Sequence, residues 1–194
     1  MQNQTRKVPE LNHIDLIKGT NLEKQRFIDD FYNGLIEYGF IVLNPFDFSF
    51  DLIDQAYEKY KEFFALPLDT KMKYSGNSSG QRGYVPRLVE HAKNSKHPDL
   101  KEFWHIGREL DNDSPYKNTF DYPNNVWPED EIKDFKKVGL AVYNQLDKVA
   151  TSLFHSLAQS LDVPQSYFEE MTHQGNSILR TIHYPPLKEF TEQD

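Results

Sequence analysis

The amino-acid sequence predicts an α+β fold in which a layer of helices covers part of a β-sheet. Apolar residues recur at helical spacing over several long stretches, which indicates amphipathic helices. Shorter runs rich in β-branched and aromatic residues lie between these stretches and indicate strands. Helices and strands do not alternate regularly, so a sheet built from βαβ units is not expected. With 194 residues, 38% of them hydrophobic, the chain can bury the core of one domain of ordinary size or slightly more.

The first predicted elements are a short extended segment at residues 8–17 and a helix behind it. Thr20 and Glu23 have the spacing of a capping box, in which two residues satisfy each other's backbone groups at a helix start. Gly39 ends this helix, because glycine readily adopts the left-handed conformation found at helix ends. The apolar run at 40–44 predicts a buried strand. The apolar stripe of the helix consists of Phe27, Ile28, Phe31, Leu35 and Tyr38.

The middle of the chain contains a second helix and two extended segments. The helix is predicted at 50–64 and is broken by Pro67, after which one or two further turns are expected. Residues 75–83, rich in glycine and serine, predict a loop. Residues 84–106 are predicted to be extended, with a polar loop at 93–98 between two segments. The stripe of the helix is Leu52, Ile53, Ala56, Tyr57, Tyr60, Phe63 and Phe64.

The longest helix is predicted to begin at Trp127 and Pro128 and to end before Pro164. Proline suits a first helical turn, and the acidic residues after it suit the positive end of the helix dipole. The predicted helix is amphipathic and more than 30 residues long, so we expect it to pack on a core. A short helix at 167–171 and a strand at 177–185 follow. The stripe comprises Val138, Val142, Leu146, Val149, Leu153, Leu157 and Leu161.

Charge and composition exclude several classes of function. Lys and Arg number 22 and Asp and Glu number 30, which gives a formal net charge of −8. An acidic protein repels phosphate at long range, so binding to nucleic acid or to an anionic membrane is not expected. The absence of cysteine excludes disulfides, thiolate catalysis and zinc–thiolate sites, and mildly favours the cytoplasm. No stretch approaches the roughly 20 apolar residues that span a bilayer, so we expect a cytoplasmic protein.

His13 and Asp15 form the first candidate site. In a strand, side chains two residues apart lie on the same face, and a His-x-Asp pair of this kind supplies two ligands in many mononuclear iron sites. A third ligand would have to come from a distant histidine such as His105 or His183. The alternative is an edge strand with solvent-facing polar residues, which the position near a terminus favours.

Arg82, Tyr84 and Arg87 lie beside the predicted loop at 75–83 and form a second candidate site. Arginine offers a rigid fork for carboxylates, and tyrosine offers an apolar ring with a polar tip. These residues therefore suit an acidic small molecule, although an ordinary surface turn is the alternative. His105 lies among bulky aromatic residues and is interpreted as a packed core residue. His155 and His173 are interpreted as helix-surface or cap residues.

Six stretches, in order along nearly the whole chain, resemble one enzyme family. They are VPELNHIDL, GLIEYGFIVLNP, FFALPLDTKMKY, RGYVP, DLKEFWHIGRE and LRTIHYPP. Together they resemble the non-haem iron, 2-oxoglutarate-dependent dioxygenases of the isopenicillin N synthase-like group. The resemblance makes VPELNHIDL the family's opening strand, which assigns His13 and Asp15 a structural role. Asn44 and Pro45 depart from the family's usual Asn-His-Gly at that point.

This resemblance implies the N-terminal helical layer and partial sheet of a jelly-roll (double-stranded β-helix) oxygenase fold, in truncated form. In the family, the iron ligands are a His-x-Asp pair and a more distant His, and all follow the HYPP segment. No histidine follows Tyr184 here. The implied cofactors, Fe(II) and 2-oxoglutarate, are therefore expected for the complete protein and not on this chain, in which no metal ligand and no catalytic residue is predicted.

The resemblance carries over four residues near the site of a complete relative. Tyr184 and Arg180 match positions on a strand close to the co-substrate or substrate. Arg82 and Tyr84 match a region that approaches a substrate carboxylate, although Arg87 and its neighbour replace an expected glycine. The implied domains are 1–120 (dioxygenase N-terminal domain), 121–175 (long helix and connection on the sheet) and 176–194 (first part of the jelly roll, incomplete).

The function implied by the resemblance is oxidation of a small organic molecule by O₂. The chain itself is expected to be inactive alone. An alternative from another class is a stand-alone, non-catalytic protein that uses the helical layer to bind a partner. A truncated sheet also exposes an unpaired edge, so we expect the strand at 177–185 to be disordered or to pair with the missing C-terminal half or another copy.

Overall fold

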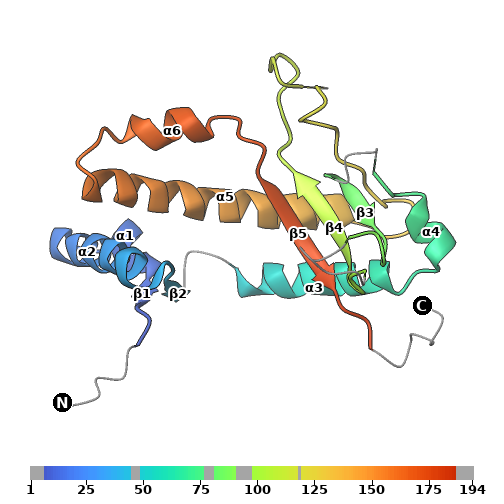
Figure 1. Cartoon of the computed structure of the whole chain (residues 1–194), viewed down its shortest axis with the longest axis horizontal. Helices are drawn as coiled ribbons and strands as arrows, with labels where there is room; N and C mark the ends of the chain where they lie inside the picture. The colour runs from blue at the N-terminus through green and yellow to red at the C-terminus, as the bar shows by residue number, and fades with distance from the viewer. Residues whose placement is uncertain (1–6, 45–48, 77–80, 91–97, 118, 187–194) are drawn as a thin grey trace. The chain divides into compact units, whose positions relative to one another are not determined.

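The computed structural model describes residues 7–44, 49–76, 81–90, 98–117 and 119–186 (Figure 1). The chain forms two compact units, and each is described by itself. The first unit comprises Met1–Phe50 and Asn144–His173, and the second comprises Asp51–Tyr143 and Gln174–Asp194. The predicted division at residues 120 and 175 stays a prediction. Parts of the predicted loops at 75–83 and 93–98 lie outside the described residues.

The first unit begins with a short parallel strand pair and two helices. Strand β1 (Glu10–Asn12) pairs with β2 (Val42–Asn44), and Leu11 lies opposite Leu43. Helix α1 (His13–Lys18) follows β1, and α2 (Asn21–Tyr38) follows α1. The predicted capping box is confirmed, because the Thr20 side chain accepts from the Glu23 backbone N–H and Glu23 accepts from the Thr20 N–H. Gly39 adopts the left-handed conformation that ends α2, as predicted.

Two predictions for this part of the chain are wrong. Residues 13–17 are helical and not extended, because the Asn12 side chain caps the helix by accepting from the Ile14 backbone N–H. The strand predicted at 40–44 is shorter, Val42–Asn44, and is not buried, since Phe40 before it is 56% and Val42 41% exposed. Among the described residues, β2 pairs with β1 alone, so it lacks the neighbouring strands of a buried central strand.

The core of the first unit joins α2 to the C-terminal part of α5 (Phe135–Ser160). Leu11, Phe27 and Phe31 are buried at its centre. This confirms the predicted apolar stripe of α2. Helix α6 (Ser166–Thr172) packs on α5 through the stacked rings of Phe154 and Phe168, 5.5 Å between centroids. Half-buried apolar residues complete the core: Leu16, Leu35, Ile41, Leu43, Leu153 and Leu157.

The second unit is built on a three-stranded antiparallel sheet. Strand β4 (Glu102–Gly107) lies between β3 (Gly83–Val85) and β5 (Ile178–His183). Along β4, Glu102 lies opposite His183 and His105 opposite Arg180. Strand β5 pairs with β4 over Ile178–His183, so it does not lack a regular structure. The expectation that it also pairs with the missing C-terminal half or with another copy stays a prediction. Its second edge has no strand partner among the described residues.

Helices cover one face of this sheet (Figure 1). Helix α3 (Phe50–Phe64) has the predicted bounds, and α4 (Leu68–Met72) is the predicted extra turn after Pro67. Phe63 lies at the centre, with its ring 4.7 Å from Trp104 and 5.9 Å from Phe135. All three side chains are buried. The aromatic residues therefore join α3, β4 and the first turn of α5 in one core.

The longest helix begins later than the sequence predicts. A turn starts at Pro128, whose carbonyl accepts from the Ile132 backbone N–H, but α5 starts only at Phe135. Asp134 separates the two with a positive φ of 63°. A left-handed residue cannot continue a right-handed helix, so the turn and the helix remain separate. Among the described residues, none of the helices combines the length and apolarity needed to cross a membrane.

Candidate functional site

The helix-covered face of the second unit contains a cluster of four polar side chains, of which Lys71, Tyr84 and Glu102 are buried and His183 is half-buried. Glu102 lies at its centre and accepts from three donors, each on a different element. Its Oε2 accepts from Lys71 Nζ at 2.7 Å and from the Tyr84 hydroxyl at 2.5 Å. Its Oε1 lies 2.8 Å from His183 Nδ1. Because an ionised carboxylate only accepts, the imidazole donates in this contact.

Burial and hydrogen bonding shift the pKa values of Glu102 and Tyr84. Burial alone would raise the pKa of Glu102, but the hydrogen bonds from Lys71, Tyr84 and His183 outweigh it, and the pKa lies below its usual 4.5. Burial, and then the hydrogen bond to Glu102, raise the pKa of Tyr84 far above its usual value. A charged glutamate therefore faces a neutral tyrosine, and the ammonium of Lys71 balances the charge.

The cluster is closed to ligands in its described form. Lys71 also donates to the Phe64 carbonyl at 3.1 Å, and the ring of His183 stacks on Phe64 at 5.1 Å. Lys71 and Glu102 are 5% and 2% exposed. The chemistry of this arrangement is structural, because it ties α4, β3, β4 and β5 together through one carboxylate.

The opposite face of the sheet contains Arg180, one of the predicted site residues. Its Nε donates to His105 Nε2 at 2.6 Å, and its guanidinium carbon lies 4.4 Å from the centre of the Phe103 ring. Its Nη1 lies 3.8 Å from Glu90 Oε2. Phe103 and His105 share this face, as the period of two predicts. His105 is a packed core residue, as expected.

Along β5 the side chains alternate between the two faces. Ile178, Arg180 and Ile182 are exposed, and the residues between them are half-buried. Tyr184 follows with 65% of its surface exposed. The predicted residues Arg180 and Tyr184 are thus both exposed, the first on β5 and the second directly after it. Their contact with a co-substrate stays a prediction.

Arg82 and Tyr84, the other two predicted residues, are buried. Arg82 donates to the Gln81 carbonyl and to Asn176 Oδ1, both at 2.8 Å. Burial lowers the pKa of Arg82. The hydroxyl of Tyr84 is bound to Glu102. Contact of either side chain with a substrate stays a prediction, and it would require these internal hydrogen bonds to open.

The interpretation of His13 and Asp15 as a metal pair loses its geometric basis. On helix α1, residues two apart point in different directions, whereas a strand would align them. His13 is buried, and its Nε2 lies 2.7 Å from the Ser152 hydroxyl oxygen. Within the described ranges, no group of three or more His, Cys, Asp or Glu side chains could hold a metal ion. His173 caps α6 as expected, and His155 pairs with Glu169 at 2.6 Å.

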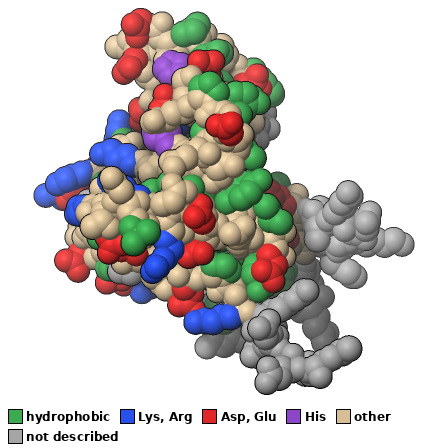
Figure 2. All heavy atoms as spheres, turned by 90° about the vertical axis from the view of Figure 1, so that its left-hand side faces the viewer, with side chains coloured by type: hydrophobic (Ala, Val, Ile, Leu, Met, Phe, Trp, Pro, Cys, Tyr) green, Lys and Arg blue, Asp and Glu red, His purple; other side chains and the backbone are tan. Residues whose placement is uncertain are grey.

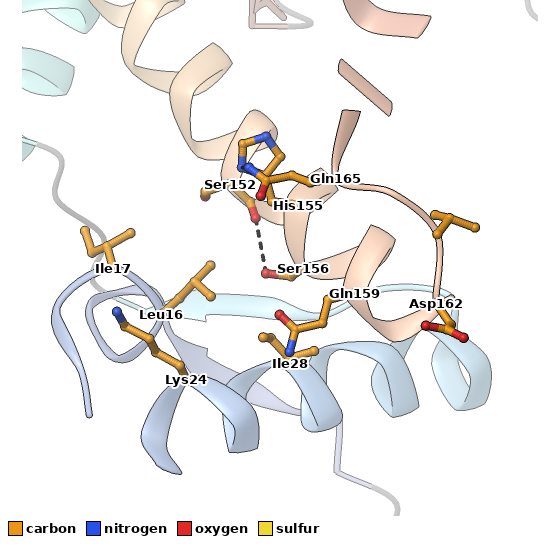
Figure 3. A pocket seen from close by; sticks show the side chains of 11 residues that line it. Leu16, Ile17, Lys24, Ile28, Ser152, His155, Ser156, Gln159, Asp162 and Gln165 are labelled. Carbon is orange, nitrogen blue, oxygen red and sulfur yellow. Dashed lines mark hydrogen bonds between the residues drawn. The ribbon is translucent and has the colours of Figure 1, made fainter. Parts of the chain in front are cut away.

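The first unit contains a groove of about 710 Å³ between α1, α2 and the end of α5 (Figure 3). The hydroxyl groups in it are used internally, since Ser156 donates to the Ser152 carbonyl and Ser152 to the Val149 carbonyl. Its charged groups are Lys24 and Asp162, which have opposite signs. Acidic, basic and hydrophobic side chains are interspersed on the face drawn in Figure 2. The groove therefore offers no convergent set of groups for one ligand.

Sequence reasoning missed the cluster around Glu102. Lys71 and Glu102 are 31 positions apart, and nothing in the local pattern pairs them. The one available signal is the position of Glu102 in a strand whose other residues are apolar or aromatic. A charge at such a position is buried and needs a partner.

Comparisons with known proteins agree with the fold. The family model described as "non-haem dioxygenase in morphine synthesis N-terminal" matches residues 11–130. The 2-oxoglutarate-Fe(II) type oxidoreductase hxnY of Emericella nidulans is 33% identical over 130 residues, which are 64% of this chain and 37% of that protein. The 2-oxoglutarate-dependent dioxygenase eupC of a Phoma species is 27% identical over 193 residues, 93% of this chain and 61% of that protein.

Solved structures show the same relationship. A crystal structure of a 2OG-Fe(II) oxygenase family protein from Caulobacter crescentus has a TM-score of 0.81 and 37% sequence identity, over 94% of this chain and 57% of that one. A full-length Neurospora crassa protein, crystallised in complex with alpha-KG, has a TM-score of 0.77 and 25% identity, over 95% of this chain and 56% of that one. The chain thus spans only about half the length of these relatives. It belongs to the non-haem 2-oxoglutarate–Fe(II) dioxygenase family and carries the N-terminal portion of its fold.

Proposed function

We propose that this chain is the scaffold portion of an Fe(II)- and 2-oxoglutarate-dependent oxygenase that acts on a small organic molecule. The observation that carries the proposal is the two-sided sheet β3–β4–β5. One face is covered by α3 through Phe63 and Trp104, and the other exposes Arg180 on strand β5. A sheet whose second face is exposed along β5 suits the wall of a ligand cavity. A cytoplasmic location is part of the proposal and is supported by the absence of cysteine.

The described residues do not fit an iron site by themselves, because they contain no group of three or more metal-binding side chains. We propose that the iron ligands belong to a further part of the fold, which completes a jelly roll over the exposed side of β5. In this arrangement Arg180 and Tyr184 face the ligand cavity. Arg82 and Tyr84 stabilise the wall from within. The chain alone is proposed to be inactive.

A chimera tests this proposal. This chain would be joined after Pro186 to the corresponding C-terminal portion of the Caulobacter crescentus relative, which is similar over 94% of this chain. Equilibrium dialysis with Fe(II) and 2-oxoglutarate under anaerobic conditions should show one metal ion per chimera and none on the chain alone. The matched control is the same chimera with its predicted His-x-Asp ligands replaced by alanine.

Two results would contradict the proposal. One is stoichiometric iron on the chain alone, especially if Asp15→Ala abolishes it. The other is a folded chimera that binds neither iron nor 2-oxoglutarate. The second result would favour the alternative, a non-catalytic binding protein that uses the oxygenase scaffold.

A further inference from the structure

Arg180 lies on the exposed side of β5 and is held there by two neighbours on β4. His105 lies directly opposite Arg180 in the β4–β5 register and accepts from its Nε at 2.6 Å. Phe103 places its ring 4.4 Å from the guanidinium carbon. The hydrogen bond to His105 fixes the Nε edge of the guanidinium, and the contact with the Phe103 ring holds the positive charge over the face of that ring. Both supporting side chains are buried, at 1% exposure for Phe103 and 4% for His105.

The contact defines the protonation state of His105. The guanidinium has no lone pair to offer, so Nε2 of His105 must be the acceptor and carry no proton. The neutral ring then has its proton on Nδ1. A protonated imidazole could not accept from Arg180 and would place a second positive charge beside it. His105 is therefore suited to orient an arginine rather than to bind an anion.

The other edge of Arg180 is only loosely balanced. Glu90 lies 3.8 Å from Nη1, which is beyond a direct hydrogen bond, and both side chains are 40% exposed. Glu90 is also 3.1 Å from Lys101, which in turn lies 2.6 Å from Asp99. The Glu90 carboxylate is thus shared between two cations. A carboxylate that approached Arg180 more closely could replace it without leaving Glu90 unpaired.

We propose that His105 is the positioning residue of Arg180 and that the Nη edge of Arg180 binds a carboxylate of a small organic ligand. The inference rests on the proposed function for the identity of the cavity. The planar Nη edge matches the two oxygens of a carboxylate, and His105 keeps Nε out of that contact. Glu90 is the counter-ion that the ligand displaces.

NMR on the whole chain tests both parts of the proposal. Titration with glutarate, 2-oxoglutarate and benzoate should shift the Arg180 Nε–H resonance in a saturable manner. A response to all three indicates recognition of any carboxylate, whereas a response to 2-oxoglutarate alone assigns the contact to the co-substrate. The imidazole nitrogens of His105 should show an unprotonated Nε2, and Arg180→Met should remove the preference for this tautomer.

Matched variants separate positioning from packing. His105→Leu fills the space without an acceptor and should weaken probe binding roughly tenfold, the effect of losing one charge-assisted hydrogen bond. His105→Gln restores an acceptor and should recover most of the affinity. Glu90→Gln should strengthen binding, because the competing charge is lost.

Equal affinity in the wild type and His105→Leu would overturn the positioning role. An Arg180 resonance that none of the three probes shifts in the wild type would overturn the carboxylate site. Either failure leaves the iron-binding result of the chimera unaffected, so the two proposals can fail separately.

Discussion

The guanidinium of Arg82 occupies the space that a side chain on Gly107 would need. A β-carbon built on Gly107 would lie 1.8 Å from Arg82 Cζ. Neither partner can easily move. Arg82 is completely buried and bound to Asn176, and Asn125 brackets the Gly107 backbone by accepting from its N–H at 2.8 Å and donating to its carbonyl at 2.9 Å. The end of β4 therefore requires glycine for reasons of space.

Gly107→Ala should destabilise the chain by about 3 kcal/mol, the upper part of the range for overpacked cores. The measurement is urea-induced unfolding followed by circular dichroism. Gly39→Ala is the control, because Gly39 has a φ of 78° but a β-carbon placed on it would meet nothing within 4 Å. The control should cost only about 1–2 kcal/mol of left-handed strain. An equal or smaller effect at Gly107 would show that Arg82 can leave its site.

Removing one partner of the buried Lys71–Glu102 pair should strongly lower the free energy of unfolding. Glu102→Gln leaves the Lys71 ammonium without its counter-charge, and a loss of about 3–5 kcal/mol is expected. The double variant Lys71→Met, Glu102→Gln should lose clearly less than the sum of the single variants, because no unpaired charge remains. Denaturant unfolding of the four proteins gives this coupling energy.

The control for this set of four proteins is the exposed pair Lys59–Glu62, whose charged atoms lie 3.3 Å apart. Glu62→Gln should cost less than about 1 kcal/mol, because exposed ion pairs are screened by solvent. If the losses of unfolding free energy in the two single variants at Lys71 and Glu102 add up to the loss in the double variant, the two side chains do not stabilise each other and the prediction is wrong.

The lowered pKa of Glu102 predicts a specific acid sensitivity. Its pKa in the folded chain lies below the ordinary 4.5, so the carboxylate's contribution to stability is complete above that pH. It is lost as the pH falls through the folded-state value. The free energy of unfolding of the wild type should therefore decrease more steeply below pH 4.5 than that of Glu102→Gln, by at most about 1.4 kcal/mol per pH unit. The prediction is wrong if the free energies of unfolding of the two proteins decrease equally steeply below pH 4.5.

Local signals in the sequence were sufficient for most of the helices. The capping box at Thr20 and the apolar stripe ended by Pro67 each act over a few residues, so the start of α2 and the bounds of α3 could be predicted. Helix α1 was missed because the cap at Asn12 precedes a helix of only six residues, too short for an apolar stripe to be recognised. The start of α5 was missed because Asp134 adopts a left-handed conformation that its residue type permits but does not require.

The candidate site was predictable only in part. The period of two predicted one side for Arg180 and Tyr184. The structure exposes Arg180 on β5, and it exposes Tyr184 directly after the strand. The partners of Arg180 depend on the register between β4 and β5, which no local pattern specifies. The same holds for the donors to Glu102, which come from three separate segments. Pairing across the sheet is therefore the information that the sequence alone did not supply.

The second edge of β5 predicts how the isolated chain behaves in solution. This edge has no strand partner among the described residues, and Ile178 and Ile182 expose 39% and 44% of their surface beside it. Open edges with apolar flanks promote pairing between chains. We expect sedimentation velocity to show self-association that increases with protein concentration, and Ile182→Lys to reduce it.

The control for this change is Leu22→Lys on α2, where a leucine that is 72% exposed is replaced by the same charge. Leu22→Lys should leave self-association unchanged, because it adds an equal charge away from the strand edge. In the chimera with the C-terminal portion, the wild-type sequence should sediment as a monomer, since the added strands cover β5. A wild-type chain that stays monomeric at high concentration, with a cooperative thermal transition, would contradict the open edge as an association site.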